Sequence, residues 1–376
     1  MRIAYDAKRA FQNSTGLGNY SRMLIRAMAG HYPDNRYFLY TPGKKHIDAA
    51  AFLLQHPDLS IRMPGGAFLP AAYWRSKGII NDLKRDNIDL YHGLSHEIPI
   101  GIQQTGIKSV VTIHDLIFLH YPKLYPAIDR WIYRAKVKNA CINADHIIAI
   151  SQNTKKDILH YFDVPAEKIS VIYQDCHPAF YEQPDPEALG QVKKELQLPE
   201  QFLLYVGTLE ERKNALLLLQ ALPLLPAEIK LVLLGKSTAY VARLQDFIAK
   251  YQLNDRVVFL KNIQQNQLPL LYRLARIFLY PSRYEGFGIP VLEALNSGTP
   301  VIAASGSSLE EAGGPGSVYV HPDDEQALAA AIRELWFNSD RRDEMAEQGR
   351  AYALQFREDV IAADTNRLYT KMMKGV

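Results

Sequence analysis

Two glutamates, Glu285 and Glu293, bracket a short segment whose composition suits the binding of a phosphorylated ligand. The segment follows an apolar run at 277–280 that is typical of a buried strand, and Pro290 favours the first turn of a helix. A helix N-terminus carries unpaired backbone N–H groups and about half a positive charge, so it readily binds phosphate. We therefore expect Glu293 in the first helical turn. Two carboxylates beside such a site could hold hydroxyl groups on either side of a diphosphate, as a nucleotide sugar would require.

A second candidate binding element is the adjacent pair Arg212 and Lys213, which follows a predicted strand at 202–206. Open α/β sheets bind ligands beyond the carboxyl ends of their strands. Two cations there could hold a diphosphate, because each charge-assisted hydrogen bond contributes about 1.5–3 kcal/mol. The alternative interpretation is a solvated helix start. Cations near a helix N-terminus oppose its dipole, however, and this favours an anionic partner.

These residues suggest how a bond between a sugar and a diphosphate could be broken without a metal. The leaving phosphate gains negative charge, and donors that are already in position stabilise it. Many enzymes of this kind use a metal held by an Asp-x-Asp motif after a strand, but the chain contains no Asp-x-Asp. We expect Arg212, Lys213 and the helix start at 287–289 to take the metal's place, with no metal and no separate cofactor.

A glycine-containing loop is predicted ahead of the first long helix. Gly16 and Gly18 follow a predicted strand at 2–5, and a strand, a glycine loop and a helix form the first unit of an α/β fold. A dinucleotide-binding fingerprint would have glycine where Ser21 stands, which argues against an NAD site. The loop could approach a ligand closely, or the glycines could serve only the turn, and both interpretations stay open.

His114 and Asp115 come directly after a predicted strand at 110–113, again at a carboxyl end where ligands bind. In the functional interpretation both face a substrate. In the alternative, Asp115 caps the next segment and His114 is a structural histidine whose hydrogen bonds are satisfied. The sequence supports both.

Composition limits the class of protein. The chain has 376 residues, of which 48% are hydrophobic and 22% charged, which is typical of a globular protein with about two domains. The 43 basic and 40 acidic residues give a net charge of +3, which argues against bulk electrostatic binding of nucleic acid. The two cysteines cannot build a disulfide framework or a zinc cluster. No apolar run reaches the ~20 residues of a membrane span and no secretory signal precedes the first strand, so we expect a cytoplasmic enzyme.

Strands and helices alternate in both halves, which predicts two doubly wound α/β domains with mainly parallel sheets. A charged, proline-rich segment at 183–187 marks the boundary. We expect domains at 1–182 and 183–355, with a final helix at about 356–376 that packs back on the first, and a ligand site in the cleft between the domains. The predicted strands are 2–5, 37–40, 88–91, 110–113, 146–150, 169–172, 202–206, 229–234, 256–260, 277–280 and 300–303.

One segment, at 67–80, mixes apolar bulk, aromatic side chains and the cations Arg75 and Lys77. In one interpretation it is a patch that rests on a membrane surface or grips an acceptor. In the other it is a helix whose apolar face packs on the sheet, and we favour this second interpretation.

Together, the order of these motifs resembles the retaining GT-B glycosyltransferases of family 4, which include glycogen synthase-like and mannosyltransferase-like enzymes. The signature is Glu-x7-Glu, present as Glu285 and Glu293 with Phe-Gly-Ile-Pro between them. The resemblance covers the whole chain, is strongest over 200–325, and implies the GT-B fold of two facing Rossmann-like domains. The other matching motifs are Gly-Thr-Leu-Glu-Glu-Arg-Lys-Asn at 207–214, Gly-Thr-Pro-Val-Ile at 298–302, His114-Asp115 and Gly16-Leu17-Gly18.

The resemblance implies a role for each candidate residue. Glu285 resembles the glutamate that holds hydroxyl groups of the donor sugar, and Glu293 resembles the one that binds the ribose. The N–H groups of Phe287, Gly288 and Ile289 resemble those that face the sugar and phosphate. Arg212 and Lys213 resemble the basic pair on the diphosphate, and Gly16 and Gly18 resemble the loop that closes over the phosphates and the acceptor. His114 resembles the histidine beside the reacting sugar, and Asn262 and Ile263 resemble the segment that flanks the base.

The resemblance also implies an activity, with His114, Glu285 and Lys213 as the catalytic residues. A sugar would move from a nucleotide diphosphate to a hydroxyl of a glycan or lipid-linked acceptor with retention of configuration. Attack would come from the same face, and the leaving phosphate would help to accept the acceptor's proton. Asp115 is the alternative general base.

The sequence departs from the family pattern at two positions, and at one motif it is similar to a particular branch of the family. Thr208 stands where many members have arginine, and Glu310-Glu311 stands where members often have Pro-Glu, which leaves the role of Glu311 open. Thr208 with Arg-Lys-Asn is similar to a bacterial branch with many mannosyltransferases of surface polysaccharides, so GDP-mannose is the first donor to test. Peripheral contact with the inner membrane face would suit a lipid-linked acceptor. Two other classes stay open, a nucleotide-sugar epimerase of GT-B architecture and a non-enzymatic sugar-binding module.

Overall fold

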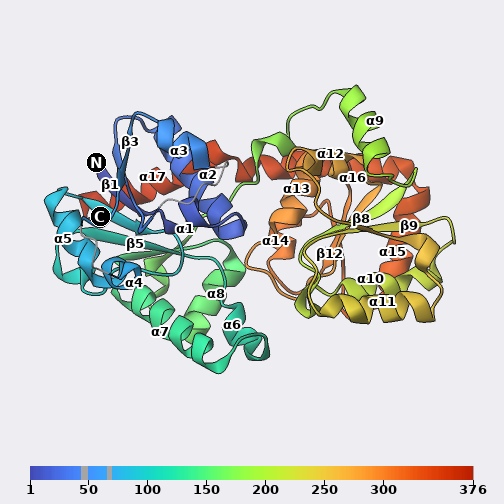
Figure 1. Cartoon of the computed structure of the whole chain (residues 1–376), viewed down its shortest axis with the longest axis horizontal. Helices are drawn as coiled ribbons and strands as arrows, with labels where there is room; N and C mark the ends of the chain where they lie inside the picture. The colour runs from blue at the N-terminus through green and yellow to red at the C-terminus, as the bar shows by residue number, and fades with distance from the viewer. Residues whose placement is uncertain (44–49, 66–69, 376) are drawn as a thin grey trace. The chain divides into compact units, whose positions relative to one another are not determined.

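The computed structural model describes residues 1–43, 50–65 and 70–375, and forms two compact units (Figure 1). The first unit comprises Met1–Asp175 and Phe356–Val376, and the second comprises Cys176–Gln355. Residues 176–182, which the sequence placed in the first domain, belong to the second unit.

A seven-stranded sheet forms the centre of the first unit, with the order β3-β2-β1-β4-β5-β6-β7 and parallel pairing between neighbours. The chain starts at a central strand and winds outward in both directions, as in a doubly wound fold. The strand β3 was not predicted. The strands are β1 Arg2–Asp6, β2 Arg36–Tyr40, β3 Leu59–Arg62, β4 Leu90–Gly93, β5 Lys108–Ile113, β6 His146–Ala149 and β7 Ile169–Val171.

Helices cover this sheet through two separate apolar clusters. Successive side chains of a strand point to opposite faces, and β1 accordingly contributes Ile3 and Tyr5 to one cluster and Ala4 to the other. Both faces are therefore buried, as is usual for a parallel sheet. The α-helices are α1 Lys8–Gln12, α2 Gly16–His31, α3 Ala51–Gln55, α4 Ala71–Tyr73, α5 Ile79–Arg85, α6 Ile117–His120, α7 Ala127–Asn143, α8 Gln152–Tyr161 and α17 Glu358–Lys374.

The last helix, α17, packs against α2 (Figure 1). Arg26 of α2 and Glu358 of α17 form an ion pair at 2.6 Å. Deeper in the unit, the Tyr369 hydroxyl lies 2.6 Å from Nδ1 of His92, whose Nε2 lies 2.7 Å from the hydroxyl of Thr112. Burial lowers the pKa of His92 to about 3, so this network is uncharged at neutral pH. The C-terminal helix is thus tied to the ends of β4 and β5.

A parallel sheet of the order β10-β9-β8-β11-β12-β13 forms the centre of the second unit. The strand β13 was not predicted. The strands are β8 Phe202–Val206, β9 Lys230–Leu234, β10 Val257–Leu260, β11 Ile277–Tyr280, β12 Val301–Ala304 and β13 Val318–Val320. The α-helices are α9 Pro186–Glu195, α10 Ala215–Ala221, α11 Tyr240–Lys250, α12 Gln267–Leu274, α13 Ile289–Ser297, α14 Leu309–Gly313, α15 Glu325–Phe337 and α16 Ser339–Ala353.

For the segment at 67–80 we favoured packing on the sheet over a surface patch, and the structure describes its residues 70–80, with 67–69 outside the described residues. Trp74 and Ile79 are buried, whereas residues 70–73 are exposed. Trp74 is 2% exposed, and its indole N–H donates to Asp82 at 2.7 Å. Arg75 forms a buried ion pair with Asp6 at 2.6 Å. These contacts support the interpretation that this segment packs on the sheet. No helix in the described parts of the chain is long and apolar enough to cross a membrane.

The tie between α17 and the sheet gives a first prediction. Replacing Tyr369 by Phe removes the hydroxyl that pairs with the buried Nδ1 of His92, and should lower the free energy of unfolding by about 1–3 kcal/mol. Urea denaturation followed by circular dichroism measures this change. Tyr73→Phe, at a tyrosine that is 51% exposed, is the control and should leave the midpoint unchanged. Equal midpoints for both variants would show that the hydroxyl of Tyr369 stabilises nothing.

Candidate functional site

The candidate site in the second unit is built on the turn between β11 and α13. The strand β11 is fully buried, and α13 begins at Ile289 with Pro290 in its first turn. Gly288, directly before the helix, has φ = +127°, and a Cβ there would lie 2.8 Å from a methyl carbon of Leu309. Only glycine therefore fits this position without strain. Ser308, at the start of α14, has its hydroxyl oxygen 2.7 Å from the carbonyl oxygen of Glu285 and 2.9 Å from that of Phe287, so its hydroxyl proton is shared between them and fixes the turn.

Glu285 is the centre of the site. Its Oε1 atom lies 3.1 Å from Nη1 of Arg212 and 3.4 Å from Nζ of Lys213, and it accepts hydrogen bonds from Tyr280 at 2.9 Å and Ser282 at 2.8 Å. The side chain is only 13% exposed. Burial alone would raise its pKa, but the charges of Lys213 and Arg212 and the two hydrogen bonds outweigh burial and lower the pKa to about 2. Glu285 is therefore ionised at neutral pH.

The two cations come from a short 3-10 helix, η7 (Glu211–Lys213), that follows β8. Arg212 also binds Glu210 at 2.6 Å and donates to the carbonyl group of Tyr284. Burial would lower the pKa of Arg212, but Glu285 and Glu210 raise it above its ordinary value. Lys213 donates to the hydroxyl of Tyr280 at 2.8 Å. The structure thus brings Arg212 and Lys213 together with Glu285, which lies more than 70 residues further along the sequence.

Glu293 lies in a different environment from Glu285. Its Oε2 atom accepts a hydrogen bond from the hydroxyl of Tyr272 at 2.8 Å. Burial raises its pKa to about 7, against the smaller lowering effects of Tyr272 and Lys213. The expected place of Glu293 in the first helical turn was wrong, because α13 starts at Ile289 and has no acidic residue in its first turn. Glu293 begins the second turn, where the helix dipole stabilises the negative charge of a carboxylate less than it does in the first turn.

The two glutamates are therefore chemically distinct. Glu285 is a pure hydrogen-bond acceptor that carries a negative charge. Glu293 can hold a proton near neutral pH, so it can both donate and accept. Pairs of carboxyl groups whose surroundings move their pKa values apart are typical of sites that divide two tasks between them.

The other candidates of this unit lie at the same sheet edge. Asn262 and Ile263 follow β10, which is separated from β8 only by β9. Asn262 has φ = +56°, a left-handed conformation that asparagine tolerates better than most residues. Because all these strands are parallel, the residues after β8, β10 and β11 emerge at one edge. No group of three or more His, Cys, Asp or Glu side chains in the described residues is arranged to hold a metal ion.

In the first unit, His114 is buried after β5. Its Nε2 atom lies 2.9 Å from the carbonyl oxygen of Leu94, so this nitrogen donates and Nδ1 is the acceptor in the neutral ring. Its ring meets Tyr20 edge-on at 4.6 Å and lies 5.4 Å from the ring of His96. Burial, followed by the charge of His96, lowers the pKa of His114 to about 3. His114 is thus an uncharged imidazole at neutral pH.

Two other groups of the first unit have clear structural tasks. Asp115 accepts a hydrogen bond from the N–H of Ile117 at 3.1 Å, in the turn that leads into α6, whose N-cap residue is Leu116. The expected glycine loop was wrong, since α2 begins at Gly16 and includes Gly18. A Cβ at Gly18 would lie 1.8 Å from the carbonyl oxygen of Asn13, whereas none of the surrounding atoms comes within 4 Å of one at Gly16. Close packing on Asn13 requires glycine at position 18.

Several contributors to the site were not predicted. Tyr280 and Tyr272 supply the hydroxyl groups on Glu285 and Glu293, and Glu210 shares Arg212. Tyr280 ends the apolar run of β11, and a tyrosine at a carboxyl end of a buried strand is a signal that could have identified it. Tyr272 lies inside a helix, where its spacing predicts only burial.

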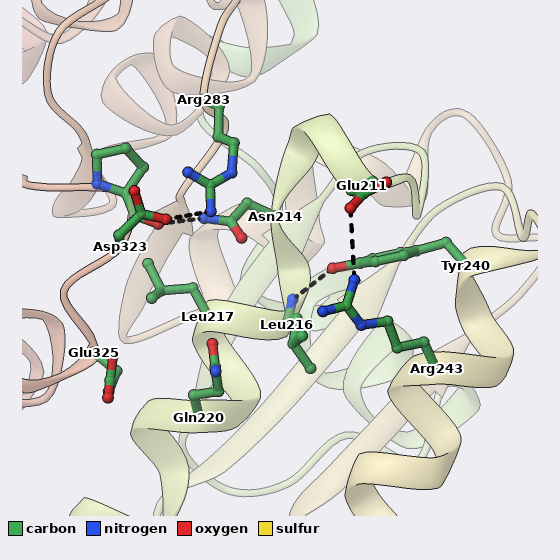
Figure 2. Close-up of a pocket in the computed structure, with 11 residues that line it drawn as sticks. Glu211, Asn214, Leu216, Leu217, Gln220, Tyr240, Arg243, Arg283, Asp323 and Glu325 are labelled. Carbon is green, nitrogen blue, oxygen red and sulfur yellow. Dashed lines mark hydrogen bonds and ion pairs between the residues drawn. The ribbon is translucent and has the colours of Figure 1, made fainter. Parts of the chain in front are cut away.

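A separate pocket of about 220 Å³ lies beside η7 (Figure 2). Two ion pairs, Arg283 with Asp323 and Arg243 with Glu211, form between residues that line it. The hydroxyl of Tyr240 accepts a hydrogen bond from the N–H of Leu216. None of the predicted donor-binding residues lines it. Its lining residues are Glu211, Asn214, Leu216, Leu217, Gln220, Tyr240, Arg243, Arg283, Pro322, Asp323 and Glu325.

The two parallel-sheet Rossmann-like units define the GT-B class of glycosyltransferases. A solved structure of HepE from Anabaena in complex with UDP and glucose matches with a TM-score of 0.75 and 19% identity, and the match covers 99% of this chain and all of that one. At this identity the likeness shows the fold.

Sequence comparison then places the chain in a family. Residues 190–352 match the family model of glycosyl transferases group 1, and residues 14–174 match that of Glycosyltransferase Family 4. O-antigen chain mannosyltransferase B of Escherichia coli is 31% identical over 272 residues, covering 71% of this chain and 70% of the relative. O-antigen chain mannosyltransferase RfbU of Salmonella typhimurium is 31% identical over 264 residues, covering 70% and 69%. The chain therefore belongs to the glycosyltransferase family described by these two models, glycosyl transferases group 1 and Glycosyltransferase Family 4.

The raised pKa of Glu293 gives a second prediction. The unfolded chain loses this proton near the ordinary pKa of 4.5, whereas the folded protein keeps it up to about 7. Between these values the folded state binds more protons, so the free energy of unfolding falls as pH rises. Glu293→Gln removes this loss, which should be about 1–2 kcal/mol after allowance for partial exposure.

Urea denaturation of both proteins at about pH 5 and about pH 8 tests this prediction. The stability of the variant relative to wild type should rise between the two pH values. Glu285 titrates in the opposite sense but is present in both proteins, so it cancels. A difference that is the same at both pH values would contradict the assigned environment of Glu293.

Proposed function

We propose that this glycosyltransferase moves a hexose from a nucleotide diphosphate to a hydroxyl of a glycan or lipid-linked acceptor, with retention of configuration. The observation that carries the proposal is the ionised carboxylate of Glu285 shared by Arg212 and Lys213. Arg212 and Lys213 lie together beyond the carboxyl end of β8, next to the start of α13. Two cations in this position suit a diphosphate in charge and geometry.

Mannose is the first sugar to test. Two relatives at 31% identity are named O-antigen chain mannosyltransferases, and both are similar to this chain over about two thirds of their length. HepE, whose likeness is in fold, was solved with UDP and glucose. We therefore propose GDP-mannose as the first donor, with UDP-glucose as the comparison.

In the proposed reaction the bond between the anomeric carbon and the diphosphate oxygen breaks, and a bond to the acceptor oxygen forms on the same face. The proton of the acceptor hydroxyl moves to the leaving diphosphate. Arg212 and Lys213 stabilise the charge that develops there, since both are positioned before the reaction begins. Asp115 is the alternative base, but one oxygen of its carboxylate already accepts a hydrogen bond from the N–H of Ile117, and this favours the phosphate in the role.

Proposed roles for the remaining residues follow from their surroundings. Glu285 accepts hydrogen bonds from hydroxyl groups of the sugar, and Glu293 exchanges hydrogen bonds with the ribose. His114 is proposed to act as a neutral imidazole beside the reacting sugar, because burial keeps it uncharged. Gly288 and Ile289 would present backbone N–H groups to the phosphate at the start of α13, with Phe287 beside them.

The third prediction concerns the central cluster. Lys213→Ala and Glu285→Gln should each lower the rate of sugar transfer by about 100-fold or more, because each removes a group that acts on the developing charge or positions the sugar. Transfer is measured with radiolabelled GDP-mannose, after a thermal-shift screen of nucleotide sugars has identified the donor that binds.

Arg243→Ala is the matched control, since Arg243 is also a cation beside η7 but is 60% exposed and pairs with Glu211. It should retain wild-type activity, and circular dichroism should show that all three variants are folded. Wild-type transfer by Lys213→Ala or Glu285→Gln would remove the site assignment. Incubating the donor without acceptor separates an epimerase, which converts the sugar, from a transferase, which hydrolyses it slowly at most.

The fourth prediction concerns metal. If Arg212, Lys213 and the start of α13 supply the positive charge at the diphosphate, transfer should keep its full rate in excess EDTA. Restoration of activity by Mg²⁺ or Mn²⁺ after a loss in EDTA would contradict the proposed charge arrangement.

The stereochemistry of transfer is read from the anomeric proton of the product by NMR, and an inverted product would exclude the same-face mechanism.

A further inference from the structure

The most exposed large apolar side chains in the described part of the chain lie on α7. Ile128 is 74% exposed and Trp131 is 73% exposed. Ile142, near the end of the same helix, is 47% exposed, and Leu124, in the short 3-10 helix that precedes α7, is 45% exposed. Exposed apolar side chains are common singly, but a contiguous group that includes a tryptophan marks an interaction surface.

The spacing of these residues places them on one face of α7. An α-helix turns by about 100° per residue, so positions 128, 131, 135 and 142 form a single stripe. Ala135 is also exposed and lies within this stripe. The buried side of the helix consists of Val137, Ala140 and Cys141, which lie roughly opposite. The helix thus has two apolar faces, one on the core and one directed into solvent; α7 is labelled in Figure 1.

Positive charges accompany the exposed stripe. The helix carries four basic residues and one acidic residue, Asp129, in a chain whose whole net charge is only +3. Arg134 and Lys138 are exposed and lie next to the stripe on the helix surface. Lys136, on another side, binds Glu97 at 3.1 Å. The stripe therefore combines tryptophan, isoleucine and cations, the composition of helices that lie in the interface of a membrane.

We propose that the exposed face of α7, formed by Ile128, Trp131, Arg134, Lys138 and Ile142, docks on the surface of a bilayer that contains anionic lipids. The apolar side chains would enter the boundary between headgroups and acyl chains, and the cations would meet the lipid phosphates. The charge of the face favours an anionic membrane over a second copy of this chain, since two copies would bring like charges together. The contact would hold the enzyme on a membrane whatever sugar it transfers.

The segment at 67–80 was the other candidate for membrane contact, and we favoured its packing on the sheet. That segment contains Trp74, which is buried in the core at 2% exposure, and Arg75, which is paired with Asp6. Trp336, the third tryptophan of the chain, is 4% exposed. Trp131 is therefore the one tryptophan that a lipid surface can reach, and it provides a natural reporter.

The fifth prediction uses this reporter on the full-length protein. Vesicles of phosphatidylcholine with phosphatidylglycerol should shift the tryptophan emission to shorter wavelength and carry the protein to the top of a flotation gradient. Vesicles of phosphatidylcholine alone should bind much more weakly. Binding should also weaken as salt rises, because the screening length falls from about 10 Å at 0.1 M to about 3 Å at 1 M.

Two variants test the face itself. Ile128→Ser combined with Trp131→Ser should abolish flotation, and Arg134→Gln combined with Lys138→Gln should weaken vesicle binding about fivefold for each cation removed. Phe337→Ser is the matched control, since Phe337 is 62% exposed but lies on α15 of the second unit. It should bind vesicles as wild type does, and all variants should melt at the wild-type temperature because the substituted side chains are exposed.

Three results would overturn the proposal. The first is the absence of binding to anionic vesicles, and the second is wild-type flotation of the Ile128→Ser, Trp131→Ser variant. The third is an emission shift that follows protein concentration without vesicles and coincides with dimer formation in sedimentation, which would assign the face to a second copy. None of these measurements depends on the donor or on catalysis, so failure here leaves the transfer reaction untouched.

Discussion

The site of this protein depends on one ionic interaction, the sharing of the Glu285 carboxylate by Arg212 and Lys213. Two adjacent cations repel each other, and their position on a short helix that leads into α10 adds to this cost. A largely buried carboxylate between them compensates the charge, and the hydroxyl groups of Tyr280 and Ser282 complete its hydrogen bonds. Removing one partner of such a buried group leaves an uncompensated charge, which is why the three residues act as a unit.

The fold explains how residues so far apart in sequence meet. β8 and β11 are neighbours in the second sheet and run parallel, so the segments that follow them leave from the same edge. β8 delivers η7 with its two cations, and β11 delivers Glu285 and the start of α13. Gly288 allows the chain to pass close to Leu309 before the helix begins. Cations, a carboxylate and a helix N-terminus therefore occupy one small region.

Much of this arrangement could be predicted from the sequence. The alternation of strands and helices indicated two parallel-sheet domains, and the residues that carry charge at strand ends were identified because ligands bind at that edge. Two strands, β3 and β13, were missed, and both are at a sheet edge. The helix starts at Gly16 and Ile289 were not located to the residue, since end positions depend on local contacts such as the packing of Gly18 on Asn13.

Side-chain environments were less accessible to sequence reasoning. The ion pairs of Glu285 are long-range contacts, and the raised pKa of Glu293 follows from burial that no local pattern reports. The aromatic segment with the buried Trp74 and the helix with the exposed Trp131 look alike in sequence, because apolar residues at helical spacing predict an apolar face but not what covers it. In α7 two such faces coexist, and only the fold shows which of them packs on the core.

The central claim is that Arg212 and Lys213, organised by Glu285, bind the diphosphate of a donor. Isothermal titration calorimetry of GDP and of UDP against wild type and Lys213→Ala tests it most directly, with guanosine and uridine as ligands that lack the phosphates. We expect the preferred diphosphate to bind about tenfold more weakly to the variant, a loss of about 1.4 kcal/mol, while its nucleoside binds both proteins equally. Equal affinity of the diphosphate for both proteins would show that Lys213 does not bind it.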